Sequence, residues 1–257
     1  MCKLPIALLL VSLCTAGVVT QQKLKPWIEW SEKEAEKMLN DSPWGQTQTE
    51  TNTSEMTYSP TSGSGGSGSA TPGAASGIRG EQSSVSKNRA TEGAYNKAVT
   101  INYRIRFLSA RPVREAISAL IVQRAAKSDT EKLIAQMQSF VERDYGDFVV
   151  VTVTYDAEDQ RLSAKAYQEF ANALAATLKN NSYLEREDGK RVFLVDYRTP
   201  IGDGLGAKFV FPRTVDGKAF LSDKNSELRF YSEVGPNVKL NRRFKVSDMV
   251  HQGKLEY

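Results

Sequence analysis

Hydrophobic and polar residues alternate one by one between residues 99 and 107. The apolar positions are Val99, Ile101, Tyr103, Ile105 and Phe107. Successive side chains of a β-strand point to opposite faces of its sheet, so this alternation predicts a strand with one buried and one polar face. Arg104 and Arg106 both lie on the polar face.

The hydrophobic period then changes to that of an α-helix. Apolar residues recur at helical spacing over residues 113–121 and again over residues 133–141. Pro112 suits the first position of the first helix, because proline lacks an N–H that this position does not use. Ser128 and Glu131 form a capping-box pattern ahead of the second helix.

The remainder of the chain predicts a strand, a third helix and then several hairpins. FVVVTVTY at residues 148–155 is rich in β-branched residues and predicts a central strand. Apolar residues at helical spacing over 167–178 predict the helix. Turn signals between β-prone segments lie at Asp188-Gly189, Asp216-Gly217 and Gly235-Pro236-Asn237. Residues 97–257 are therefore expected to form one globular α+β domain: strand, helices, strand, helix, then an antiparallel β-rich meander.

The segment at residues 21–59 contains all the tryptophans of the chain, Trp27, Trp30 and Trp44. Ser31 and Glu34 form a capping box, and Pro43 disfavours helical backbone in the residue before it. These signals predict a short helix over residues 31–40, with a tryptophan near each end. We call residues 21–59 the tryptophan arm.

A helix of this length is not stable alone in water, so its apolar face must pack against another surface. That face carries Ala35, Met38 and Leu39. Two surfaces could receive it and the indoles: the globular domain of the same chain, or another envelope protein. Threonines alternate with polar residues in the segment that follows, residues 46–59, which predicts an exposed edge strand.

The flanking segments suggest export and a tether. Residues 1–20 have the charged start, apolar core and small residues of a secretory signal peptide, which implies a periplasmic or extracellular protein. Both cysteines, Cys2 and Cys14, lie in this region, so no disulfide is expected in the mature chain. An alternative use of Cys14 is lipidation. Residues 60–96 begin as a Gly/Ser-rich stretch and predict a flexible linker.

Charge is mildly basic, with 34 Lys and Arg against 30 Asp and Glu, interleaved along the chain. This mixture does not have the concentrated basic surface of a nucleic-acid-binding protein. Arg104 and Arg106, with Lys239, Arg242 and Lys245, could instead form a basic area that meets an anionic polymer or an acidic partner. The alternative is an ordinary solvated sheet face.

No pattern identifies a catalytic, metal or cofactor site. His251 is the only histidine, and its nearness in sequence to Ser247 and Asp248 does not supply the geometry of a triad. The glycine-rich stretch at 202–206 lacks the following helix of a phosphate-binding loop. Acidic residues that could serve hydrolysis or calcium binding are Asp156, Glu158, Asp159, Asp196 and Asp203, and each has a structural interpretation as a solvated turn or loop residue.

One motif carries a resemblance. Residues 30–45 follow the pattern W-S-x-x-x-A-x-x-x-L-x-x-S-P-W-G, which resembles the opening of a family of uncharacterised bacterial exported proteins. IRFLSARPVREAI and the closing FKVSDMVHQGKLEY are similar to that family as well. The resemblance implies a bacterial origin and brings no activity and no catalytic residues.

These observations favour an exported, non-catalytic interaction or structural protein of the bacterial envelope. The residues expected to make contacts are Trp27, Trp30, Met38, Leu39, Trp44, Arg104 and Arg106. The alternatives are an envelope hydrolase that uses carboxylates and a lipid-anchored envelope assembly factor. No cofactor is expected, and the expected partner is an envelope protein or an anionic polymer.

Overall fold

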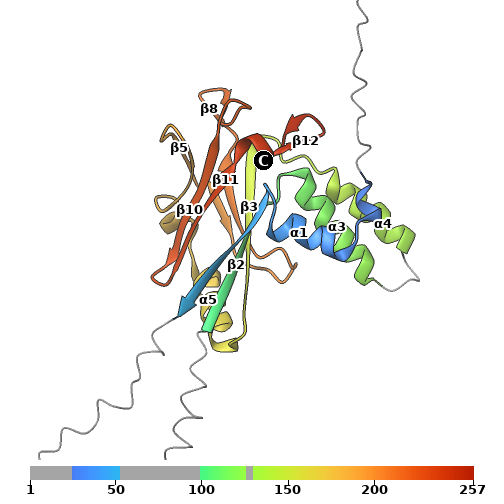
Figure 1. The fold of residues 1–257 in the computed structure, drawn as a ribbon. Coiled ribbons are helices and arrows are strands. Elements are labelled where there is room, and N and C mark those ends of the chain that lie inside the picture. Colours follow the sequence, from blue (N-terminus) through green and yellow to red (C-terminus); the bar gives the residue numbers. More distant parts are fainter. Residues whose placement is uncertain (1–24, 53–98, 126–129) are drawn as a thin grey trace, which may run out of the picture.

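The computed structural model describes residues 25–52, 99–125 and 130–257. The expected signal peptide and the expected linker at 60–96 lie outside these residues, as does Ser128 of the second capping box. The fold is α+β, with antiparallel sheets and a β-rich second half, as the sequence predicts (Figure 1).

Two antiparallel sheets form the body of the molecule. The first has the strand order β1-β2-β3-β7-β6 and the second has the order β11-β10-β4-β5. The strands of the first sheet are β1 (Gly45–Asn52), β2 (Val99–Phe107), β3 (Phe148–Ala157), β6 (Asp196–Arg198) and β7 (Ala207–Pro212). Those of the second are β4 (Ser182–Arg186), β5 (Arg191–Phe193), β10 (Glu227–Gly235) and β11 (Val238–Lys245).

Aromatic rings fill the space between the sheets. Phe107 of β2 meets Phe244 of β11 edge to face, with ring centroids 4.9 Å apart. Phe209 and Phe211 of β7 both meet Phe230 of β10. All of these rings are fully buried. Aromatic pairs add to the hydrophobic free energy of burial, and here they join the two sheets directly.

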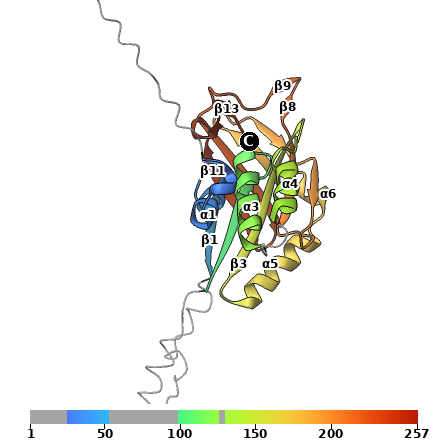
Figure 2. The ribbon, with the colours of Figure 1, turned by 90° about the vertical axis from the view of Figure 1, so that its right-hand side faces the viewer.

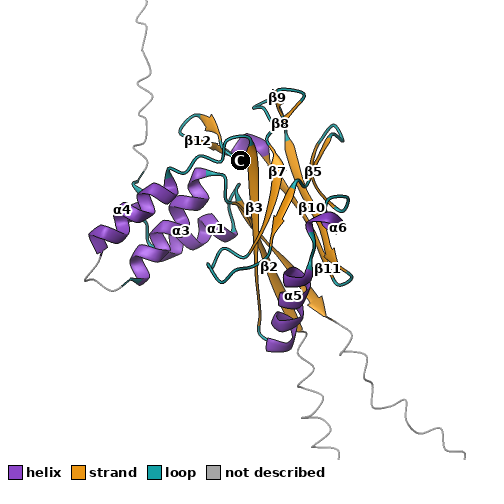
Figure 3. Ribbon diagram, turned by 180° about the vertical axis from the view of Figure 1, so that it is seen from behind, coloured by secondary structure: helices purple, strands orange, loops and turns teal. Residues whose placement is uncertain are grey.

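Helices cover the first sheet on its other side. They are α1 (Glu32–Asn40), α3 (Arg111–Arg124) and α4 (Thr130–Val141), which group to one side of the strands in Figure 1 and lie in front of them in Figure 2. Helix α5 (Gln160–Asn172) lies elsewhere, near the ends of the strands, and is followed by α6 (Ala175–Leu178) (Figure 3). Phe170 of α5 is fully buried and stacks on Tyr155 at 5.3 Å, so α5 packs against the sheet interior at this end.

Most predicted elements are present with small shifts. The strand over 99–107, the central strand that begins at Phe148, the helices after Pro112 and before Gly146, and the hairpins at Gly189 and Gly235 are confirmed. Asp216-Gly217 joins a small hairpin, β8 (Thr214–Val215) and β9 (Lys218–Ala219). The C-terminal residues add a 3₁₀ turn at Val246–Asp248 and a last hairpin, β12 (Val250–His251) and β13 (Lys254–Leu255).

Two elements differ from the pattern. The β-prone segment after the Asp188-Gly189 turn, residues 190–197, predicts one strand by its pattern, but the chain leaves one sheet and enters the other between β5 and β6. The helix expected over 167–178 begins earlier, because the Asp159 side chain caps it by accepting from Arg161 N. It is also interrupted at Ala173, whose backbone is extended.

The tryptophan arm is part of this fold. β1 is the edge strand of the first sheet and pairs antiparallel with β2, from Gly45 opposite Arg106 to Asn52 opposite Val99. The edge-strand prediction is therefore confirmed for residues 46–52. The chain turns sharply from α1 into β1 at Gly45, where an added Cβ would lie 2.3 Å from the Leu39 carbonyl oxygen.

We expect Gly45→Ala to destabilise the protein by at least about 1–3 kcal/mol, because the backbone of α1 cannot move away from the new methyl group without losing its packing. Urea unfolding measures the change, with Gln46→Ala on the same strand as the control. Equal midpoints for the two variants would show that the turn tolerates a side chain.

Candidate functional site

The start of the arm is organised by hydrogen bonds that the sequence predicts. The Ser31 side chain accepts from Glu34 N, and the Glu34 carboxylate accepts from Ser31 N at 2.6 Å, which completes the capping box of α1. Glu34 also pairs with Lys25 at 2.8 Å. These contacts, Lys25 first and then Ser31, lower the pKa of Glu34 to about 2.

The turn after α1 involves further residues of the motif at residues 30–45. Ser42 Oγ donates to Met38 O and accepts from the backbone N–H groups of Trp44 and Gly45. Ala35 and Leu39, the apolar positions of the motif, are buried in the main core. Ser31, Ala35, Leu39 and Ser42 of the motif therefore each fold the arm or pack it against the domain.

Two of the tryptophans are buried against the domain of their own chain. Trp27, in the 3₁₀ turn η1 (Trp27–Glu29), is 6% exposed, and its indole N–H donates to Gln138 Oε1 of α4 at 3.2 Å. Trp44 is 5% exposed and donates to the Glu256 carbonyl oxygen at 2.7 Å. Of the two surfaces considered for the arm, the structure shows docking on its own domain.

Arg106 binds the tryptophan arm through hydrogen bonds to α1. The expectation that Arg106 belongs to an exposed basic area is wrong, because the residue is buried. Its side chain lies beneath the C-terminal end of α1 and is 8% exposed as a residue. It donates to the Leu39 carbonyl oxygen at 3.0 Å, to Asn40 Oδ1 at 2.9 Å and to Thr154 Oγ1 at 3.2 Å. Burial lowers the pKa of Arg106 to about 10.

The other members of the expected basic area are dispersed. Arg242 also serves the arm, because it donates to the Thr47 carbonyl oxygen of β1. Arg104 is part-exposed and pairs with Asp156 at 2.9 Å. Lys239 pairs with Glu233 and Lys245 with Asp248, so each of these cations has an acidic neighbour. They form no uniform positive surface.

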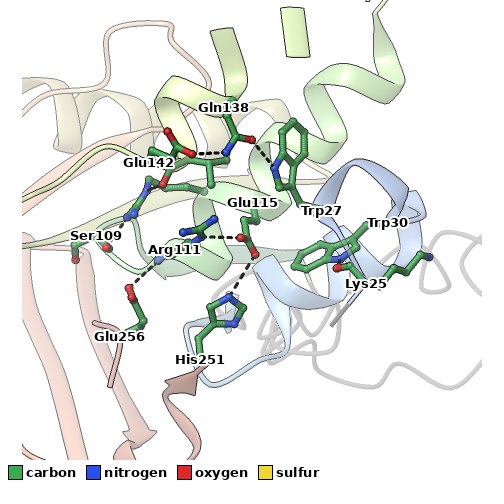
Figure 4. A network of polar contacts seen from close by, with 12 residues as sticks. Lys25, Trp27, Trp30, Ser109, Arg111, Glu115, Gln138, Glu142, His251 and Glu256 are labelled. Carbon is green, nitrogen blue, oxygen red and sulfur yellow. Dashed lines mark hydrogen bonds and ion pairs between the residues drawn. The ribbon is translucent and has the colours of Figure 1, made fainter. Parts of the chain in front are cut away.

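The docked arm completes a cleft, which we call the arm cleft (Figure 4). Its volume is about 500 Å³, and three parts of the chain line it: the arm, helices α3 and α4, and the last hairpin. Its lining residues from the arm include Lys25, Ile28, Trp30, Glu34 and Met38. Clefts of this size with apolar walls and a few converging polar groups are the usual form of small-molecule sites.

Three charged or titratable side chains meet at one side of the arm cleft. Glu115 of α3 is 6% exposed and accepts from Arg111 Nε at 2.9 Å, while His251 Nε2 lies 3.7 Å from its other oxygen (Figure 4). That distance is too long for a hydrogen bond, and His251 Nε2 is a buried atom without a hydrogen-bond partner among the described residues. The imidazole also meets the Trp44 ring edge to face.

The sequence indicates His251 as a candidate but not Arg111 or Glu115. The neighbours of His251 in sequence, Ser247 and Asp248, form no triad with it: Ser247 Oγ bonds Asp248 on the exposed surface, and His251 instead approaches Glu115. The spacing of Arg111 and Glu115, four apart on one helix, was an available signal for an ion pair. Nothing local indicated that His251 would join them.

Most of the acidic residues that could serve hydrolysis or calcium binding cap a helix or pair with a basic side chain. Asp159 caps α5, Asp156 pairs with Arg104, and Asp203 pairs with Lys208 at 2.7 Å. Asp196 pairs with Arg198 at 3.3 Å. Among the described residues no group of three or more His, Cys, Asp or Glu side chains is placed to hold a metal ion.

Comparisons with known proteins provide no relative: no family model, no curated protein and no solved structure matches the chain. Within the described part of the chain, no helix is both long enough and apolar enough to cross a membrane.

Replacement of Arg106 by methionine tests its role in arm docking. We expect Arg106→Met to lower the free energy of unfolding by about 1.5–3 kcal/mol, because carbonyl groups of α1 lose a charged donor. Amide hydrogen exchange should accelerate in α1 and β1. The matched control is Arg104→Met on the same strand face, expected to cost less than about 0.5 kcal/mol because its ion pair is part-exposed. Similar losses from both variants would contradict the assignment.

The Glu34 contacts predict acid sensitivity of the arm. The pKa of Glu34 is lower in the folded protein than its ordinary value of 4.5, so its contribution is present above about pH 4.5 and is lost as the pH falls towards 2. In wild type, amide exchange in α1 should rise over this range relative to the central strand β3. In Glu34→Gln this pH-dependent rise should shrink, and an unchanged rise would exclude Glu34 as its source.

Proposed function

We propose that this protein is an exported, non-catalytic binding or structural protein of the bacterial envelope, and that the arm cleft is its contact site. The single observation that carries the proposal is the construction of this cleft. Trp27 and Trp44 are used to dock the arm on its own domain, whereas Trp30 remains half-buried at the cleft wall.

Trp30 is less buried than Trp27 and Trp44, which supports a role for Trp30 in contacting a partner. Its indole N–H donates to the Lys25 carbonyl oxygen at 3.0 Å, and its own carbonyl accepts from Gln123 of α3. These bonds hold the ring in place without burying it fully. Ile28 beside it is 47% exposed, so the cleft offers apolar surface that a partner would cover.

Export to the bacterial envelope is proposed from the signal-peptide pattern of residues 1–20 and from the motif resemblance. A cleft that is preformed by the docked arm suits a contact role there, because little conformational entropy is lost on binding.

Capture from bacterial envelope extract tests the proposal. We expect immobilised full-length protein to retain envelope material, Trp30→Ala to lose most of that retention, and Leu174→Ala to keep it. Leu174 is the control because it is 65% exposed and lies outside the cleft. Amide exchange of α1 in Trp30→Ala verifies that the arm is still docked.

Equal retention by wild type and Trp30→Ala would count against the arm cleft as the contact site. Hydrolysis of envelope material that disappears in Asp156→Asn or Asp203→Asn would favour the carboxylate hydrolase instead. Either result would overturn the proposal.

A further inference from the structure

We propose that the arm cleft is a saccharide-binding site that accepts neutral hexose or N-acetylhexosamine rings of a glycan. This inference rests on the proposed function and specifies its ligand class. Three features of the cleft support it: the apolar wall, the polar side and the balance of charges.

The wall of the cleft suits the face of a sugar ring. Trp30, Ile28 and Met38 supply aromatic and aliphatic surface. Because the Trp30 N–H is already bonded to the Lys25 carbonyl oxygen, the ring itself rather than its polar edge is left for an occupant. Pyranose rings carry C–H groups on their faces and pack against aromatic rings through these groups, as they do in many sugar-binding proteins.

The polar side of the cleft suits hydroxyl groups. Arg111 and Glu115 place a donor next to an acceptor at 2.9 Å, and neighbouring sugar hydroxyls both donate and accept. His251 lies behind this pair, where its buried Nε2 atom is 3.7 Å from Glu115. A glycan hydroxyl can bond Arg111 and Glu115 without bringing a charge into the cleft, whereas an apolar ligand would cover them without offering hydrogen bonds.

Gln252 adds a neutral polar group to the cleft. It lines the cleft from the turn of the last hairpin, and the residue is exposed. Its φ of +51° and that of Gly253, +77°, belong to the two-residue turn between His251 and Lys254, because both central residues of such a hairpin turn adopt positive φ. The side-chain amide provides one donor group and one acceptor in a neutral residue, as recognition of hydroxyl or acetamido groups requires.

The charge balance selects a neutral glycan. The cleft contains the cations Lys25 and Arg111 and the anions Glu34 and Glu115, and these occur as the pairs Lys25–Glu34 and Arg111–Glu115. An anionic polymer would therefore meet as many acidic as basic groups. This differs from the anionic partner expected from Arg104 and Arg106, which lie outside the cleft.

Titration of the full-length protein with neutral trisaccharides tests the inference. The probes are triacetylchitotriose, cellotriose and maltotriose, measured by calorimetry and by tryptophan emission. We expect at least one to bind and Trp30→Leu to weaken it about tenfold or more, the equivalent of about 1.4 kcal/mol. Trp30→Phe, which keeps an aromatic ring, should weaken binding less than Trp30→Leu, and Leu174→Ala should leave it unchanged.

A second variant, Gln252→Gly, tests the site independently in case Trp30→Leu fails to fold. Gln252→Gly removes the amide and relieves the positive φ, so it should weaken saccharide binding without lowering the unfolding midpoint. Binding that is insensitive to both Trp30→Leu and Gln252→Gly would overturn the site.

The remaining outcomes separate this inference from the proposed function. Binding of oligogalacturonate alone, with no neutral probe bound, would overturn the neutral-glycan assignment. If no saccharide binds while Trp30→Ala still abolishes envelope capture, the saccharide inference is wrong and the proposed function stands. If neither capture nor saccharide binding is observed, both are wrong.

Discussion

A buried guanidinium group joins the tryptophan arm to the rest of the molecule. Arg106 is enclosed between the polar face of β2 and the end of α1, where it bonds the Leu39 carbonyl oxygen and the Asn40 side chain. Burying a charge is costly unless its donors are paired, and the C-terminal end of a helix supplies carbonyl groups with partial negative charge. The arm therefore offsets the free-energy cost of burying the Arg106 guanidinium group in the domain. This makes the arm an integral part of the fold although a long segment separates it from β2.

The hydrogen bonds of Arg106 fix the position of the arm, and the arm makes further contacts with both sheets and the C-terminal residues. β1 pairs with β2 in a single register, and Gln48 of β1 donates to the Lys239 carbonyl oxygen of β11, which links the edges of both sheets. Trp44 donates to the Glu256 carbonyl oxygen, and Arg111 N donates to the Glu256 carboxylate. Residues from both ends of the described chain thus meet beside α3, and the last hairpin is held next to the arm.

The arm cleft is a consequence of this meeting. The arm supplies its apolar wall, α3 supplies Arg111 and Glu115, and the last hairpin supplies His251 and Gln252. No single segment contains a recognisable site, and the cleft exists only with the arm docked. Binding in the cleft would accordingly stabilise the docked arm, because a ligand that contacts all three segments favours the state in which they are together. The proposed function and the stability of the fold are linked through the same contacts.

Several features depend only on residues close along the chain, and these could be predicted from the sequence. The alternation in β2, the capping box of α1, the central strand β3 and the hairpin turns at Gly189 and Gly235 were all predictable, because each is set by local period, capping or backbone preference. Packing between distant segments, in contrast, buries Arg106, divides residues 190–197 between two sheets and brings His251 close to Glu115. Alternation shows that a strand has two different faces but not what covers the polar one, and Arg104 and Arg106 look identical in sequence. Arg106 is buried and Arg104 is part-exposed because α1 ends over Arg106. The position of that helix end is set by packing between distant segments.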